Sequence, residues 1–221
     1  MSLPRTPKAV VFDMDGLIFD TESLYRDAMI LASQERGHDM PLPLFLSMIG
    51  LPGDSSRVVL TGHFGEDFDV DAFWKASSGH FYEMAKTQLC LKAGVVELLD
   101  TLDEFALPRA IATSSRHQDA EHHLESQNLL GRFHTVVAQG DYAKGKPAPD
   151  PFLTAAARLG VDPADCLALE DSHNGIRAAS AAGMMAIMVP DLLDPTQEIE
   201  SLCVRIARDL HEVEALVRAT R

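Results

Sequence analysis

Cysteine, basic side chains and long apolar runs are all scarce in this sequence. Three cysteines, Cys90, Cys166 and Cys203, occur among 221 residues, and none of them lies in a CxxC spacing. That usage excludes a disulfide framework and indicates reduced thiols, so we expect a cytoplasmic protein. The first apolar run, residues 9–12, is too short for the core of a signal sequence or for a membrane span. The sequence therefore predicts a soluble chain with no membrane partner.

Basic side chains are outnumbered: 19 Lys and Arg residues stand against 33 Asp and Glu residues, and the formal net charge is −14. Such a surface repels the phosphate backbone of a nucleic acid, which argues against a polymer of that kind as a partner. A small anion can still bind where a metal ion and one lysine reverse the field locally. We expect the chain itself to be a monomer or a weak dimer.

The composition is otherwise that of a globular protein, with 46% hydrophobic and 24% charged residues. Short apolar runs recur along the chain, and patterns of helical spacing lie between them, as at residues 95–102 and 152–159. Strands that alternate with helices predict an α/β protein with a doubly wound, parallel, Rossmann-like sheet. The predicted strands are residues 9–12, 107–112, 135–138, 166–169 and 185–189.

Residues 21–90 break this alternation. They contain no strand-like run, whereas Leu24, Ala28 and Leu31 share one helical face, and prolines and glycines divide the stretch into short segments. This pattern predicts an all-helical insert, with residues 1–20 and 91–221 forming the α/β catalytic core. An insert at the carboxyl end of a strand lies where open α/β sheets bind their ligands.

Asp13 and Asp15 follow the first predicted strand directly, and Gly16 comes after them. Two carboxylates this close repel each other unless a cation lies between them, and Mg²⁺ prefers oxygen ligands of this kind. A carboxylate can also attack phosphorus and form an acyl phosphate. Gly16 allows a tight turn and a close approach of a ligand to the backbone. The alternative interpretation of the pair is a solvated acidic turn.

Polar groups also follow the second predicted strand and lie in the loop before residues 152–159. Thr113 and Ser114 offer a hydroxyl and successive backbone N–H groups that can cradle an anion, although Ser114 or Ser115 could simply cap a helix. Lys146 precedes a proline, which holds the lysine backbone extended. Its ammonium group could neutralise both a phosphoryl group and a carboxylate, and a solvated loop lysine is the alternative.

Glu170 and Asp171 close the fourth predicted strand, and a helical pattern follows at residues 173–183. Two carboxylates at a strand end suit a metal ion, but Asp171 or Ser172 could also cap the helix. The small residues of that helix suit close packing on the sheet, and Gly183 suits its C-terminal cap. Because the carboxyl ends of parallel strands share one edge, the four motifs together predict a single site there.

With these residues the chain resembles the haloacid dehalogenase superfamily, in particular its phosphatase and β-phosphoglucomutase-like branch. The resemblance covers nearly the whole chain. It implies a Mg²⁺-dependent phosphatase of a small phosphorylated metabolite, such as a sugar or nucleoside monophosphate, and a small helical cap that closes over the substrate. The most specific matching pieces are Phe12-Asp13-Met14-Asp15-Gly16, Asp20-Thr21-Glu22, Lys146-Pro147, and Glu170-Asp171-Ser172 with Gly175.

The resemblance also implies a role for each site residue. Asp13 is the nucleophile that forms a phosphoaspartate, and Asp15 is the general acid and base whose backbone carbonyl binds Mg²⁺. Thr113, Ser114 and Lys146 bind the transferring phosphoryl group. The implied metal site consists of Asp13, Asp15, Asp171 and Glu170, the last acting directly or through water.

The insert departs from the β-phosphoglucomutase pattern. Those mutases carry a cap histidine where this chain has Tyr25, and a cap arginine just after the glycine of a loop that here begins at Gly50. The nearest arginine in this chain is Arg57. These departures favour hydrolysis over a phosphosugar mutase reaction, which is the alternative. The candidate substrate contacts in the insert are Gly50, Arg57 and Lys75.

Two further functions can be compared with these. True haloacid dehalogenases lack an aspartate two positions after the nucleophile, so Asp15 argues against that reaction. A non-catalytic binding protein could keep the same scaffold. It would not need Asp13, Asp15, Lys146 and Asp171 together.

Overall fold

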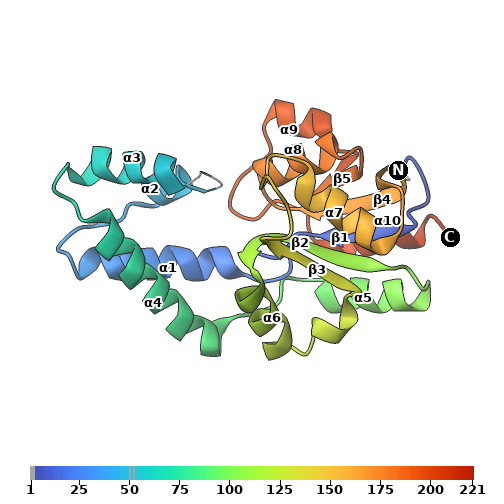
Figure 1. The fold of residues 1–221 in the computed structure, drawn as a ribbon, viewed down its shortest axis with the longest axis horizontal. Coiled ribbons are helices and arrows are strands. Elements are labelled where there is room, and N and C mark those ends of the chain that lie inside the picture. Colours follow the sequence, from blue (N-terminus) through green and yellow to red (C-terminus); the bar gives the residue numbers. More distant parts are fainter. Residues whose placement is uncertain (1–2, 50, 52) are drawn as a thin grey trace. The chain divides into compact units, whose positions relative to one another are not determined.

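A computed structural model of the chain describes residues 3–49, 51 and 53–221. Within them a parallel sheet has six strands in the order β3-β2-β1-β4-β5-β6 (Figure 1). The first strand of the sequence is central and pairs with β2 on one side and β4 on the other. The predicted α/β class with a parallel sheet is confirmed. The strands are β1 (Ala9–Phe12), β2 (Arg109–Arg116), β3 (Thr135–Gln139), β4 (Cys166–Glu170), β5 (Met185–Met188) and β6 (Arg205–Ile206).

Two features of the sheet differ from the sequence prediction by more than one residue at a strand end. The second strand was expected at residues 107–112 but runs from Arg109 to Arg116, and its register against β3 shifts between Ala112 and Arg116. Its last residues are polar, so the apolar pattern ends before the strand does. The short edge strand β6 was not predicted, because two half-buried residues leave no periodic signal.

Helices cover both faces of the sheet. The core of one face joins alternate strand residues to α7 (Asp150–Leu159), α8 (His173–Ala181) and α9 (Gln197–Leu202). The opposite face carries α5 (Val95–Glu104) and α6 (His117–Ser126), and α10 (Leu210–Arg218) packs on α5 (Figure 1). Single turns of 3₁₀-helix, η1 (Leu130–Arg132) and η2 (Pro163–Asp165), precede β3 and β4. The central strands are buried on both faces, as the continuous apolar runs predicted.

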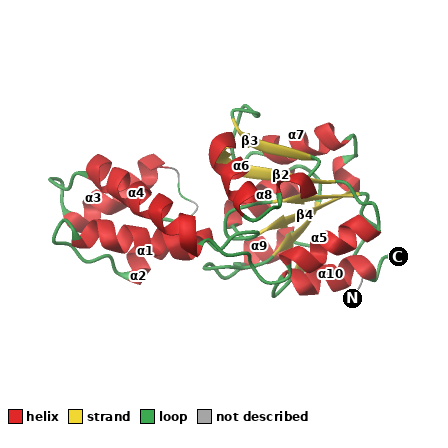
Figure 2. Cartoon of the chain, turned by 90° about the horizontal axis from the view of Figure 1, so that it is seen from below, coloured by secondary structure: helices red, strands yellow, loops and turns green. Residues whose placement is uncertain are grey.

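The chain divides into two compact units, Met1–Phe19 with Leu91–Arg221 and Asp20–Cys90. The second, here called the helical unit, contains α1 (Thr21–Gln34), α2 (Leu42–Leu46), α3 (Gly53–Phe64) and α4 (Val70–Gln88) (Figure 2). Its longest helices, α1 and α4, pack against each other. Across that contact the rings of Tyr25 and Phe81 stack 3.9 Å apart. In the part of the chain that the structure describes, no helix is both long and apolar enough to span a membrane.

Candidate active site

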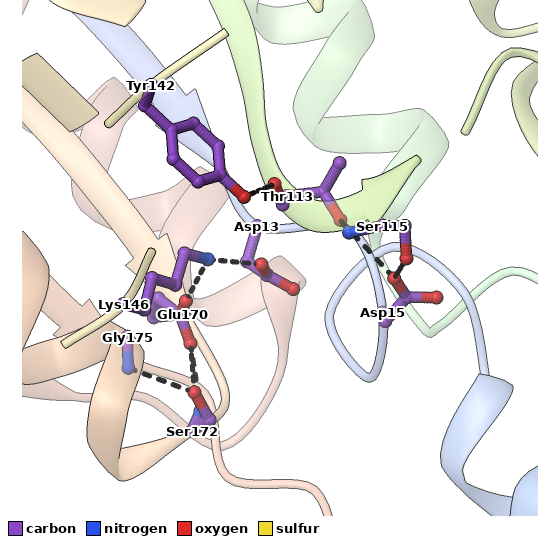
Figure 3. A network of polar contacts seen from close by, with 9 residues as sticks. All are labelled: Asp13, Asp15, Thr113, Ser115, Tyr142, Lys146, Glu170, Ser172 and Gly175. Atoms are coloured by element: carbon purple, nitrogen blue, oxygen red, sulfur yellow. Dashed lines mark hydrogen bonds and ion pairs between the residues drawn. The ribbon is translucent and has the colours of Figure 1, made fainter. Parts of the chain in front are cut away.

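The carboxyl ends of β1, β2 and β4 bring the predicted motifs to one edge of the sheet. Asp13 directly follows β1, and its backbone N–H donates to the carbonyl of Leu169 on β4 at 2.9 Å. Thr113 lies near the end of β2, and Glu170 is the last residue of β4. Figure 3 shows these side chains together with Lys146 from the loop before α7. The strand order β2-β1-β4 is therefore what assembles the site.

Lys146 joins the first and fourth motifs. Its ammonium group donates to Oδ1 of Asp13 and to Oε1 of Glu170 (Figure 3). All three side chains are buried, with exposed fractions of 6% for Lys146, 9% for Asp13 and 1% for Glu170. The ring of Phe152 lies 5.0 Å from the same ammonium group. Lys146 is therefore a buried, directed cation and not a solvated loop lysine, which settles the alternative left by the sequence.

Glu170 is held from both sides. Its Oε2 accepts hydrogen bonds from the backbone N–H and the hydroxyl of Ser172, each at 2.9 Å. Ser172 in turn caps α8 by accepting from the N–H of Gly175 at 3.1 Å. A Cβ on Gly175 would lie 1.7 Å from Glu170 Oε1, so only glycine leaves room for this carboxylate. These contacts hold Glu170 in a position from which it can orient Lys146. Direct ligation of a metal ion by Glu170 stays a prediction.

Asp15 lies in a different environment from Asp13. Its Oδ2 accepts a hydrogen bond from the hydroxyl of Ser115 at 2.7 Å and a longer one from the hydroxyl of Thr113 at 3.4 Å. The backbone N–H of Ser115 donates to Thr113 Oγ1 at 3.0 Å, which orients that hydroxyl. The two aspartates thus have separate partners, Lys146 for one and the end of β2 for the other (Figure 3).

The contact between Ser115 and Asp15 was not predicted from the sequence. The structure keeps Ser114 and Ser115 within β2, and α6 begins only at His117, so neither serine is the N-cap considered above. Ser114, a predicted phosphate ligand, is exposed at the end of the strand. Tyr142 was also missed: its hydroxyl donates to the carbonyl of Thr113 at 3.1 Å. Only the placement of the β3–α7 loop beside β2 could reveal that contact.

Gly16 and Asp171 are in close contact. Gly16 has φ +82°, and a Cβ built on it would lie 2.3 Å from Oδ2 of Asp171. The carboxylate of Asp171 therefore lies against the backbone that follows Asp15, and Asp171 is only 8% exposed. Gly16 is needed both for its positive φ and for this close approach.

The electrostatics of the site indicate a deficit of positive charge. Burial raises the pKa of Asp13 to about 8, with further contributions from Glu170 and Asp15, while Lys146 opposes the shift. Burial also disfavours the charged form of Lys146, but the carboxylates of Asp13 and Glu170 outweigh it and hold the pKa of Lys146 above its ordinary range. One ammonium group faces several carboxylates, so a bound cation would lower the free energy of the ionised site.

The residues present fit a magnesium ion with few protein ligands. Among the described residues, no group of three or more His, Cys, Asp or Glu side chains is arranged to hold a metal. Mg²⁺ commonly needs only one or two carboxylates, because it keeps several of its waters. The buried carboxylates of Asp13 and Asp171 lie at neighbouring strand ends, and Gly16 leaves space for that of Asp171, so the two match that requirement.

Two of the three predicted contacts in the helical unit, Arg57 and Lys75, lie on its helices. Arg57 on α3 pairs with Asp71 and lies 5.0 Å from the ring centroid of Trp74. Lys75 is exposed on α4. Gly50 lies outside the described residues. The roles of these three residues in substrate binding stay predictions.

Comparison with known proteins identifies the family of this site. Residues 7–183 match the family model described as haloacid dehalogenase-like hydrolase. The chain belongs to this family. It is 36% identical to a protein of Drosophila melanogaster named "Probable pseudouridine-5'-phosphatase", over 82% of this chain and 80% of the relative. It is 34% identical to the β-phosphoglucomutase of Bacillus subtilis, over 82% and 83% of the two chains.

A solved structure of similar fold is the HAD hydrolase, family IA, variant 3, from Entamoeba histolytica. It has a TM-score of 0.80, is 24% identical, and aligns over 96% of this chain and 99% of that one. The resemblance stated from the sequence motifs is confirmed by these matches. As a member of the family the chain is a phosphomonoester hydrolase.

Proposed function

We propose that this hydrolase is a Mg²⁺-dependent phosphatase that works through a phosphoaspartate on Asp13. Its substrate is a small sugar or nucleoside monophosphate, and the helical unit acts as the cap that binds the rest of that substrate. The observation that carries the proposal is the separation of the two aspartates. Asp13 is bound to a buried lysine, whereas Asp15 is bound to hydroxyl groups. Two carboxylates in such different environments can divide nucleophilic and proton-transfer roles.

In the first step an oxygen of Asp13 attacks phosphorus, and the bond between phosphorus and the ester oxygen breaks. Asp15, protonated at this stage, gives its proton to the leaving oxygen, so the product departs as an alcohol. Lys146 offsets the negative charge that Asp13 and the phosphoryl group bring together. The hydroxyl of Thr113 and the backbone at Ser114 bind the phosphoryl oxygens. When bound, Mg²⁺ supplies further neutralisation of that charge.

In the second step water attacks phosphorus, and the bond between phosphorus and Asp13 breaks. Asp15 takes the proton of the attacking water, which restores its protonated form, and inorganic phosphate leaves. The hydroxyl of Ser115, 2.7 Å from Oδ2 of Asp15, holds the acid in place through both steps.

The helical unit supports hydrolysis over mutase chemistry. Tyr25, at the position of the mutase histidine, stacks on Phe81 with an angle of 9° between the rings. Arg57, the nearest arginine to the expected loop, forms an ion pair with Asp71. A mutase must also exclude water from its phosphoaspartate, and a phosphatase must admit it.

The test is a screen for phosphate release from sugar and nucleoside monophosphates, with Mg²⁺ and after chelation. We expect release that needs Mg²⁺ and no bisphosphate activator. Interconversion of sugar phosphates that requires such an activator would favour the mutase. Absence of Mg²⁺-dependent hydrolysis across the whole panel would favour a binding protein on this scaffold.

A further inference from the structure

The helical unit contains a cavity of about 260 Å³. The described residues that line it number nine, and all of them lie between positions 22 and 74, so the helical unit alone forms its walls. Six of these side chains are apolar or aromatic, among them Tyr25, Phe45 and Trp74. The cavity is smaller than the sites that usually hold drug-sized ligands, and it suits one ring system better than a large cofactor.

Two of the aromatic walls are held in place by neighbours behind them. One face of Tyr25 is covered by Phe81, at 3.9 Å. The ring of Trp74 has the guanidinium of Arg57 at 5.0 Å from its centroid, and Arg57 is itself paired with Asp71. Rings that are already ordered lose little conformational freedom when a ligand stacks on them. The cavity therefore presents ordered aromatic rings on which a flat ligand can stack.

The polar groups of the cavity are few, which restricts what it can bind. Besides the Tyr25 hydroxyl and the Trp74 N–H, the described lining offers the side chains of Glu22 and Ser56, and Ser56 is only 8% exposed. A hexose carries several hydroxyl groups, and these few polar side chains could replace the water partners of only some of them. Glu22 is the one charged side chain of this lining. It favours a ligand that presents N–H donors.

We propose that this cavity binds a heteroaromatic base, which makes nucleoside monophosphates the substrate class of the enzyme. The base stacks on Trp74 and Tyr25 and donates N–H groups to Glu22. The link from base binding to catalysis rests on the proposed function. The binding of a base to the cavity does not, because the cavity lies entirely in the helical unit.

Trp74 provides a direct test, because it is the one tryptophan in the sequence. Uridine and adenosine are titrated separately into the full-length protein, with excitation at the red edge of the tryptophan band, where both absorb little. We expect a saturable change in fluorescence with at least one nucleoside and none with ribose. No saturable change with either nucleoside would overturn the proposal, whether or not the protein hydrolyses phosphate esters.

A kinetic test connects the cavity to turnover. The ratio kcat/KM is measured for uridine 5′-monophosphate, adenosine 5′-monophosphate and ribose 5-phosphate in the wild type, Trp74→Leu and Glu22→Gln. Both variants should lose about tenfold or more on the better nucleotide, as expected for a lost stacking or charged contact, and stay within about twofold on ribose 5-phosphate. Glu66→Gln, an exposed substitution in the same unit, is the matched control and should behave as wild type.

Equal losses on nucleotide and ribose 5-phosphate would show a structural effect of the variants and overturn the assignment of the base. A wild type whose kcat/KM is higher for ribose 5-phosphate than for either nucleotide would also overturn that assignment. Failure of the proposed function gives a different result. None of the three phosphates would then be hydrolysed, while the fluorescence titration would still show whether the cavity binds a nucleoside.

Discussion

At the scale of single residues, the environments of Asp13 and Asp15 explain why two like side chains can do different work. Asp13 is buried against Lys146, whereas the Oδ2 of Asp15 accepts hydrogen bonds from two hydroxyls. Burial favours the neutral form of Asp13, so this proposed nucleophile stays charged only with the help of cations. A nucleophile needs that charge, and an acid must be able to carry a proton.

We expect Asp13→Asn to lower phosphatase turnover by at least about 10³-fold, because an amide cannot form the acyl phosphate. The variant should melt at or slightly above the wild-type temperature, since it removes a buried charge that burial disfavours, while Lys146 keeps its contact with Glu170. Phosphate release and thermal unfolding are measured on the same preparation. Near-normal phosphatase activity would contradict the assignment of Asp13.

Gly175→Ala should disturb the site through packing alone. The new Cβ would overlap the carboxylate of Glu170, which must then move away from Lys146. We expect a loss of about 1–3 kcal/mol in the free energy of unfolding, measured in urea, together with lower activity. Gly62→Ala is the control, because no neighbour lies within 4 Å of its Cβ on α3, and it should stabilise by about 0.5–1 kcal/mol. A free energy of unfolding for Gly175→Ala that is no lower than that of the wild type would show that Glu170 has more freedom than its contacts indicate.

At the scale of elements, the loop from β3 to α7 connects the site to the sheet. It carries Lys146 and also Tyr142, whose hydroxyl binds the end of β2. The loop is anchored at Asp141, which accepts from the N–H of Ala138 at 3.1 Å, His117 at 2.8 Å and Arg158 at 3.0 Å. Three segments far apart in the sequence therefore meet at one carboxylate.

The anchor predicts a pH dependence of stability. Arg158 above all, followed by the N–H of Ala138 and by His117, holds the pKa of Asp141 at about 2, below the ordinary 3.8. Because the folded pKa lies below the unfolded one, this contribution is complete above about pH 4 and is lost as the pH falls through about 2. Partial exposure and solvent screening reduce it to about 1 kcal/mol.

Asp141→Asn should therefore unfold about 1 kcal/mol more easily than wild type at neutral pH, and the difference should shrink as the pH falls from about 4 towards 2. Urea unfolding at a series of pH values measures both. Asp67→Asn, at an exposed position of the helical unit, is the comparison variant. A difference that stays constant over the acid range would mean that the substitution acts through packing and not through the charge of Asp141.

At the scale of the whole molecule, one unit holds the acidic site and the other holds the aromatic cavity. The formal net charge of −14 makes the entire surface unfavourable for an anionic substrate. Local cations at the site have to overcome that field. The proposed requirement for Mg²⁺ therefore has a cause in the charge of the whole molecule as well as in the residues of the site.

Mg²⁺ should raise the melting temperature of the protein in a concentration-dependent manner, because it binds the folded site and not the unfolded chain. Chelation should remove this shift together with the activity, and added Mg²⁺ should restore both. Asp171→Asn should lose the Mg²⁺-dependent shift, whereas Asp67→Asn keeps it. A shift of wild-type size in Asp171→Asn would exclude that carboxylate as a ligand.

Much of the fold follows from local patterns. Continuous apolar runs predicted the central strands, since a strand buried on both faces has no polar alternation, and β1 begins and ends where expected. The helical pattern at residues 152–159 corresponds to α7, and Gly183 has the positive φ of a helix end. The motifs Asp13-Met14-Asp15 and Glu170-Asp171 were visible because each stands at the end of such a run.

Other features depend on contacts between segments distant in the sequence. Ser115 reaches Asp15 because β2 lies beside β1 and shifts its register near its end, which no local pattern encodes. Tyr142 binds Thr113 for the same kind of reason. By itself the sequence determined which residues carry charge, hydroxyl groups or apolar surface, and which of them end strands. Tertiary structure decided which of these groups meet, because strand order and loop placement arise from packing across the whole sheet.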